Sequence, residues 1–136
     1  MTLIGISNPV GVGASLNYLG DRVYAYSGTF ASLNSATTML EFTTGSESIK
    51  GQLVCNAAID FSTGNIDSGV TTGFKVSIDG QVVSLMKTDS GAEDMPSNTV
   101  QELILAPFTT VKVERIASGG NATFLNTATF TGRIYA

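Results

Sequence analysis

The sequence contains no histidine, no tryptophan and only one cysteine. Without histidine the chain lacks the commonest general base and the commonest metal ligand of proteins. Catalytic triads of the Ser-His-Asp or Cys-His type are therefore excluded within one chain. One cysteine cannot form an internal disulfide, so no disulfide-stapled secreted framework is implied. We expect a protein that is not an enzyme and that holds neither a cofactor nor a metal.

Charge is also scarce, since charged residues make up 13% of the 136 residues. Soluble domains usually carry about 25%. Ser, Thr, Asn and Gly take their place, as is common in β proteins that pack against copies or partners, although β composition alone also accounts for it. The seven basic residues are scattered along the sequence and the net charge is −4. We therefore expect no nucleic-acid partner.

Long apolar runs are missing as well. No stretch approaches the roughly 18 apolar residues of a membrane span. The first twenty residues lack the charged start and compact apolar run of a signal peptide. The sequence predicts a protein outside the membrane that is not secreted by that route.

The stretch FKVSIDGQVVSLMK, residues 74–87, is the clearest local signal. Asp79 and Gly80 are suited to the two positive φ angles of a type I′ turn, which predicts a tight hairpin. In the simplest register Val76 faces Val83 and Phe74 faces Leu85, on one apolar face. Such a face needs a second layer, so the hairpin belongs to a larger β structure.

Other stretches also alternate with a period of two, among them RVYAYSGTF, TMLEFTT, IKGQLVCNAAIDF, TTVKVERI and ATFLNTATFTGRIYA. The run from Ile49 to Phe61 is long for a strand, so we expect a bend or bulge at Gly51 or at Ala57-Ala58. The stretch TVQELILAP favours a strand, with one short helix as the alternative. About eight strands result, which predicts an all-β fold: an antiparallel, jelly-roll-like β-sandwich over residues 21–136.

The first twenty residues differ from the rest, because they combine four glycines and one proline with isolated apolar residues and no charge. They predict an extended N-terminal arm over residues 1–20. The arm is too apolar for a solvated tail, so we expect it to dock on a partner. The residues expected to make that contact are Leu3, Ile4, Val10 and Tyr18.

Few residues could carry chemistry. Glu41 and Asp60 could form a glycosidase pair, but both lie in the polar phase of their strands, where surface acids are the default. The acidic loop with Asp89, Glu93 and Asp94 has oxygen ligands that calcium takes but lacks EF-hand spacing. Cys55 lies in phase with apolar residues, which predicts a buried structural thiol.

The four tyrosines leave two interpretations open. Aromatic rings could form a platform that stacks on sugars, but strand tyrosines are more often packing residues with a solvated hydroxyl. The residues concerned are Tyr18, Tyr24, Tyr26 and Tyr135.

The phrases GDRVYAYSGTF, LEFTTGS, APFTTVKVERI and FTGRIYA resemble, in order and character, head decoration (cement) proteins of tailed bacteriophages, over residues 20–136. The resemblance implies a jelly roll that trimerises, clamps neighbouring subunits of the major capsid protein and needs no catalytic residues. It implies a virion protein assembled in the host cytoplasm. The alternative is a receptor- or carbohydrate-binding β-sandwich of a phage tail fibre or spike.

Overall fold

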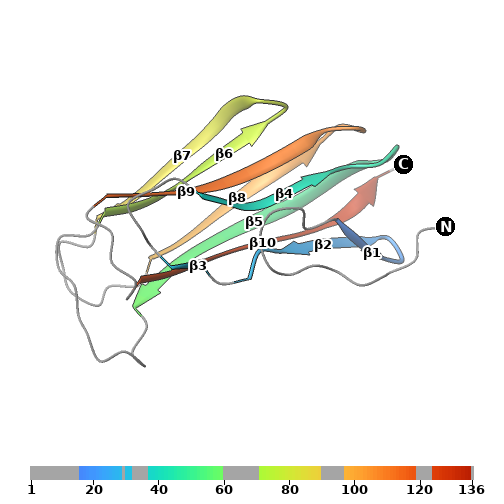
Figure 1. Ribbon diagram of the computed structural model, residues 1–136. Coiled ribbons are helices and arrows are strands. Elements are labelled where there is room, and N and C mark those ends of the chain that lie inside the picture. Colours follow the sequence, from blue (N-terminus) through green and yellow to red (C-terminus); the bar gives the residue numbers. More distant parts are fainter. Residues whose placement is uncertain are drawn as a thin grey trace.

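The computed structural model describes residues 16–28, 30–31, 37–59, 71–89, 97–118 and 124–135. These residues form ten strands in two antiparallel sheets, which Figure 1 shows as two layers. Sheet A contains β1 (Asn17–Leu19), β2 (Arg22–Tyr26), β3 (Phe30–Ala31), β5 (Ser48–Ile59), β8 (Ser97–Leu105) and β10 (Phe124–Tyr135). Sheet B contains β4 (Thr37–Thr43), β6 (Thr71–Ile78), β7 (Gln81–Asp89) and β9 (Thr110–Ser118).

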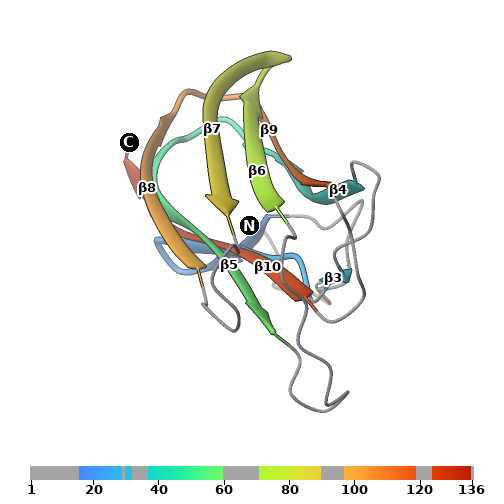
Figure 2. The ribbon, with the colours of Figure 1, turned by 90° about the vertical axis from the view of Figure 1, so that its left-hand side faces the viewer.

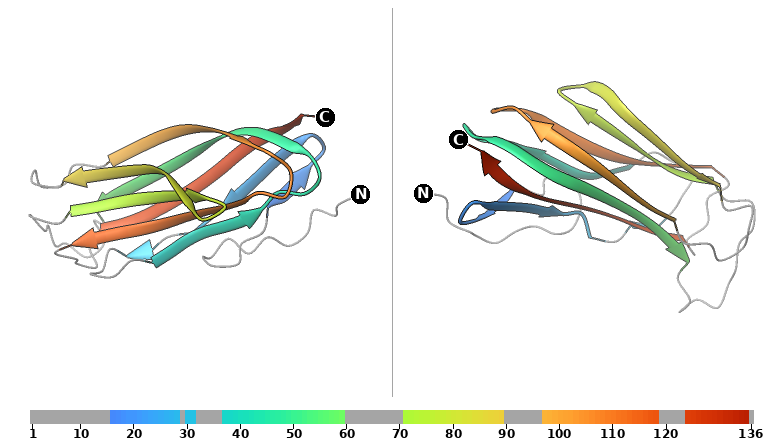
Figure 3. Two further views of the ribbon diagram at one scale, coloured as in Figure 1. Left: turned by 90° about the horizontal axis from the view of Figure 1, so that it is seen from above. Right: turned by 180° about the vertical axis from the view of Figure 1, so that it is seen from behind.

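The strand order is that of a jelly roll. Sheet A runs β2-β10-β5-β8 and sheet B runs β4-β9-β6-β7, with β1 beside β2 and β3 beside β10. Among the eight main strands the first therefore pairs with the last, the second with the seventh, and so inward to the β6–β7 hairpin, as two Greek keys wrap into a double sheet. Figure 3 shows the two sheets stacked, with sheet B in front in its left view. The predicted all-β sandwich is confirmed.

The core lies between the sheets. On β2 the small side chains of Val23 and Ala25 are buried, whereas Tyr24 and Tyr26 lie on the outer face. Large residues of both sheets fill the interior instead, and the rings of Phe42 (β4) and Phe130 (β10) join the two sheets with centroids 5.0 Å apart. Other fully buried core residues are Met39, Leu40, Ile49, Leu53, Phe74, Val76, Leu105, Val111 and Val113.

The β6–β7 hairpin has the predicted turn but not the predicted register. Asp79 and Gly80 have φ angles of 49° and 83°, as the turn requires. The pairing then shifts between Val76 and Ser77, so Val76 faces Ser84 and Lys75 faces Leu85. The predicted Val76–Val83 and Phe74–Leu85 pairs are therefore wrong. A β-bulge, which places one extra residue on β7, turns the side chains of that strand over.

Of the other strand predictions, one is confirmed and one is wrong. The TVQELILAP stretch is a strand, β8, and the short-helix alternative is wrong. The register of β5 with both β8 and β10 is continuous, so the expected bulge at Gly51 or Ala57-Ala58 is absent from β5. A bulge lies in β4 instead, between Thr38 and Leu40, which explains why the consecutive residues Met39 and Leu40 are both buried.

The N-terminal boundary of the sandwich lies earlier than expected. Residues 17–19 form β1, which pairs with β2, and Leu16 is buried in the core. The sheet therefore includes residues that the sequence assigned to the arm, and Tyr18 packs partly buried against the core. Leu3, Ile4 and Val10 lie outside the described residues. No helix within the described ranges has the length and apolarity needed to cross a membrane.

Candidate functional site

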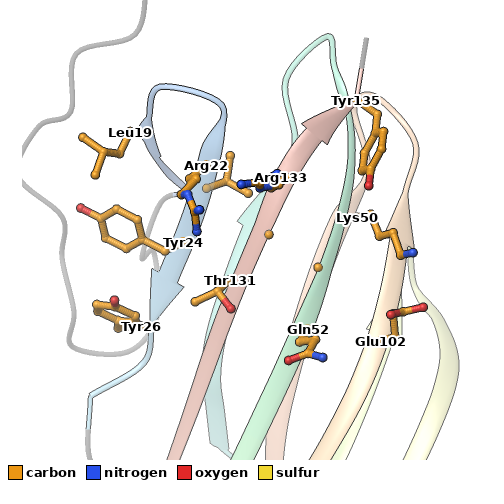
Figure 4. Close-up of a pocket in the computed structure, with 13 residues that line it drawn as sticks. Leu19, Arg22, Tyr24, Tyr26, Lys50, Gln52, Glu102, Thr131, Arg133 and Tyr135 are labelled. Carbon is orange, nitrogen blue, oxygen red and sulfur yellow. The ribbon is translucent and has the colours of Figure 1, made fainter.

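A groove of about 420 Å³ lies on the outer face of sheet A. Figure 4 shows side chains from β1, β2, β10, β5 and β8 that project from this face. Leu19, Tyr24 and Tyr26 lie along one side, and Tyr135, Lys50 and Glu102 along the other. Thr131 and Gln52 lie between them. We refer to this surface as the sheet A groove.

A row of three cationic side chains crosses the groove. Arg133 on β10 is directly in register with Arg22 on β2 and with Lys50 on β5. All three side chains are exposed. Directly opposed residues have Cβ atoms about 4.5–5.5 Å apart, a spacing at which like charges repel. These three basic residues are scattered in the sequence, but the fold brings them side by side.

Among the residues that the structure describes, the row has no acidic partner at ion-pair distance. Within the described part of the chain the only ion pair is Lys75 with Glu114, on sheet B, at 3.4 Å. Glu102 lines the groove but stands one row away, in register with Gln52. The groove therefore carries excess positive charge on a chain whose net charge is −4.

Three of the four tyrosines meet at the groove. Tyr24 and Tyr26 alternate along β2, so they share one face, and their rings lie 5.1 Å apart with a tilt of 36°. Tyr135, at the end of β10, lies on the other side. Tyr18 is not part of this group, because it faces the core from β1. Of the four tyrosines, three therefore line one groove.

Two glycines lie beneath the groove, where β5 and β10 pass closely. Gly51 is in register with Gly132. A Cβ at Gly51 would stand 2.4 Å from the carbonyl oxygen of Thr131 and 2.6 Å from a ring carbon of Phe130. Because one neighbour is backbone, it cannot give way cheaply. Glycine is therefore required here for the strands to pack on the Phe130 ring.

A second surface lies at the edges of the two sheets that the described residues form. β8 ends sheet A and β7 ends sheet B, and Figures 2 and 3 show these strands on the same side of the sandwich. Five exposed aliphatic side chains belong to these two strands: Val82, Val83 and Leu85 on β7, and Val100 and Ile104 on β8. We refer to them as the aliphatic edges.

The remaining candidates form no site in the described structure. Cys55 is fully buried in the core as predicted, and burial raises the pKa of its thiol to about 12. Glu41 is half-buried on β4, and its suggested partner Asp60 lies outside the described residues, as do Glu93 and Asp94. Within the described ranges, no three acidic or thiol side chains lie close enough to hold a metal ion.

No protein-family model matches the chain, and no curated protein is similar to it in sequence. Solved structures share its fold. VP2 of infectious bursal disease virus, from a subviral particle, has a TM-score of 0.52 and 15% identity over 99% of this chain and 37% of VP2. The Gx strain of that virus gives a TM-score of 0.52 and 14% identity, over 100% of this chain and 38% of the other.

A third similar structure is a family 35 carbohydrate-binding module from Clostridium thermocellum. It has a TM-score of 0.41 and 13% identity, over 96% of this chain and 85% of that one. This score is too low to bear on function. The chain spans just over a third of the viral proteins, and at these identities the likeness shows the fold alone. The shared fold is a β-sandwich, which VP2 of these virus particles also has.

Sequence reasoning missed the cationic row and the aliphatic edges. The alternation RVYAYS did place both β2 tyrosines on one face, but not which face was buried. The row joins residues 22, 50 and 133, and only the register of three strands brings them together. The exposure of Val83 and Leu85 follows from the β7 bulge and the edge position, neither of which has a local sequence signal.

Proposed function

We propose that this chain is a virion structural protein that assembles with copies of itself and reinforces a capsid. The observation that carries the proposal is the pair of aliphatic edges on β7 and β8. Soluble monomers usually blunt free edge strands with charge, proline or a covering segment. Here Leu85 and Ile104, on adjacent edges, are 69% and 76% exposed.

Burial of these side chains is the proposed source of the association energy. Apolar surface contributes roughly 25 cal/mol for each Å² removed from water. An unpaired edge strand also presents backbone N–H and C=O groups to which another strand can bond. Edges of both sheets can therefore contact a second copy at once. The jelly-roll fold, shared with VP2 in its viral particles, supports this assignment.

The proposed oligomeric state and binding partner follow from the resemblance to decoration proteins. The expected assembly is a trimer that binds the lattice of the major capsid protein and forms part of the virion. Many copies with a modest contact each raise the cost of separating lattice subunits, because their engagement is multivalent. The segment before Leu16, with Leu3, Ile4 and Val10, is the proposed lattice contact.

The test combines sedimentation with particle binding. Leu85→Lys with Val100→Lys adds a charge to each edge and should convert the oligomer to a monomer without loss of the fold. The control is Leu19→Lys, since Leu19 is also exposed, at 62%, but lies on the opposite edge of sheet A. It should leave the oligomer intact. Deletion of residues 1–15 should preserve the oligomer and abolish co-sedimentation with capsids of the virus that encodes the chain.

Any one of three results would contradict this function. The first is absence of the chain from purified virions, and the second is a wild-type protein that is monomeric at all concentrations. The third is an edge variant that assembles as well as the Leu19 variant. Undiminished particle binding by the truncated chain would remove only the N-terminal segment from the mechanism.

A second candidate function, recognition of a receptor or carbohydrate, is favoured by one observation. Tyr24, Tyr26 and Tyr135 line a single groove with cations and hydrogen-bonding side chains. Ligand sites of this kind are concave and combine aromatic surface with a few polar groups.

A further inference from the structure

We propose that the sheet A groove binds a saccharide that carries a carboxylate group. The inference does not depend on assembly through the aliphatic edges, because the groove residues tested below lie on β2 and β10 rather than on β7 or β8. It rests on three features of the groove: a row of cations, a pair of aromatic rings and a set of side chains able to bond hydroxyl groups.

The cation row selects for an anion. Arg22, Arg133 and Lys50 stand side by side on three strands, and none has an acidic partner at ion-pair distance within the described residues. The row is costly in the free protein, because like charges on directly opposed residues repel. A bound carboxylate would relieve this repulsion. Guanidinium groups match the geometry of a carboxylate with two parallel hydrogen bonds.

The aromatic pair selects for a ring. Tyr24 and Tyr26 lie next to the cations along β2, with Tyr26 45% exposed. A partly exposed aromatic face in a groove can pack against the apolar face of a sugar ring, with the tyrosine hydroxyl left for a hydrogen bond. An inorganic anion would make no use of these rings.

The remaining polar groups select for hydroxyls. Thr131 lies between Tyr24 and Gln52, in the row next to the cations. Its hydroxyl both donates and accepts, and the Gln52 amide does the same through two atoms. Glu102 adds an acceptor-only group in that row. A carboxylate acceptor suits a hydroxyl donor but repels an acidic peptide, so the groove favours a carboxylated saccharide over an acidic protein segment.

Binding is measured by calorimetry with a panel of carboxylated oligosaccharides: oligogalacturonate, oligomannuronate, hyaluronate and sialyllactose. Each has a neutral counterpart in which the carboxylate is a methyl ester. We expect at least one acidic member to bind, and its ester to bind about tenfold more weakly or not at all. Higher salt should weaken binding, because the groove is open to solvent.

Three variants assign the binding to the groove. Arg133→Gln and Tyr26→Ala should each weaken binding by about tenfold, the first through the anion and the second through the ring. Lys112→Gln removes a cation on β9 in sheet B and should leave binding unchanged. Arg133→Gln should also unfold at the same or a higher temperature than the wild type, since it relieves repulsion. A purely structural arginine would give the opposite shift.

Each alternative result overturns the proposal. Equal binding of the acidic saccharide and its methyl ester would show that the cations do not recognise a carboxylate. Equal binding of hexa-aspartate and the acidic sugars would show a general electrostatic surface. Failure of every acidic saccharide to bind would remove the site, whereas the oligomer test of the edges would be unaffected.

Discussion

The sheet A groove and the aliphatic edges are two surfaces of one sandwich with opposite chemistry. The groove brings three cations and three tyrosines together over β2, β10 and β5. The edges expose aliphatic side chains on β7 and β8. Along the row that starts at Arg22, the outer face of sheet A changes from cationic to aliphatic, since Lys50 is directly in register with Ile104.

One jelly roll can therefore offer separate surfaces to partners of separate kinds. Aliphatic edges suit a protein neighbour, because water is expelled and edge hydrogen bonds are completed. A cationic, aromatic groove suits a polar, charged ligand. Variants that disturb one region and spare the other, or both together, test this division.

The largest expected effect breaks the groove. Gly51→Ala places a Cβ against the Thr131 carbonyl oxygen and the Phe130 ring, so β5 and β10 must move apart. We expect a loss of about 2–3 kcal/mol in the free energy of unfolding, as for other overpacked cores. Urea denaturation measures it. Gly45→Ala is the control, because its nearest neighbour is the flexible Glu47 side chain at 3.2 Å. Equal stability of the two variants would contradict the close approach.

An intermediate effect acts on the shared core. The Cys55 thiol has a pKa of about 12 in the folded protein, against about 8.5 when unfolded. The folded state therefore keeps its proton where the unfolded state releases it. The contribution of the protonated, buried thiol to the stability of the fold is full below about pH 8.5 and is lost as the pH rises towards 12.

Between pH 7 and 10 the free energy of unfolding of the wild type should therefore fall by about 1–2 kcal/mol more than that of Cys55→Ala. Denaturant unfolding at each pH measures the two slopes, and parallel slopes would refute the burial argument. Groove and edges should weaken together, since both rest on this core.

The smallest effect acts on the edge hairpin. Gly80 has a φ of 83° in the β6–β7 turn, and a Cβ there meets no neighbour within 4 Å. Gly80→Ala should therefore cost only the backbone strain, about 1 kcal/mol. Faster hydrogen exchange in β6 and β7, with unchanged groove strands, would confine the loss to the edge. An unaltered stability would show that the turn tolerates a side chain.

The sequence predicted what depends on neighbours along the chain. Asp79-Gly80 fixed the turn because the required φ angles are local. The phase of Cys55 predicted its burial, because alternation along one strand defines two faces. The count of strands and their alternation predicted the sandwich.

What the sequence could not predict depends on contacts between distant segments. The side chains of Tyr24 and Tyr26 are larger and carry more apolar surface than those of Val23 and Ala25. They nevertheless face outward, because Phe42 and Phe130 already fill the interior. A bulge shifts every residue of β7 beyond it, and no local signal marks the position. The cationic row exists only through the pairing of β2, β10 and β5.

Hydrogen exchange of the assembled wild type, compared with that of the Leu85→Lys, Val100→Lys variant, shows whether copies associate through the aliphatic edges. If copies meet through the aliphatic edges, backbone amides of β7 and β8 should exchange more slowly in the wild-type assembly, with β2 and β10 unchanged. Equal exchange in β7 and β8, or protection in β2 instead, would contradict it.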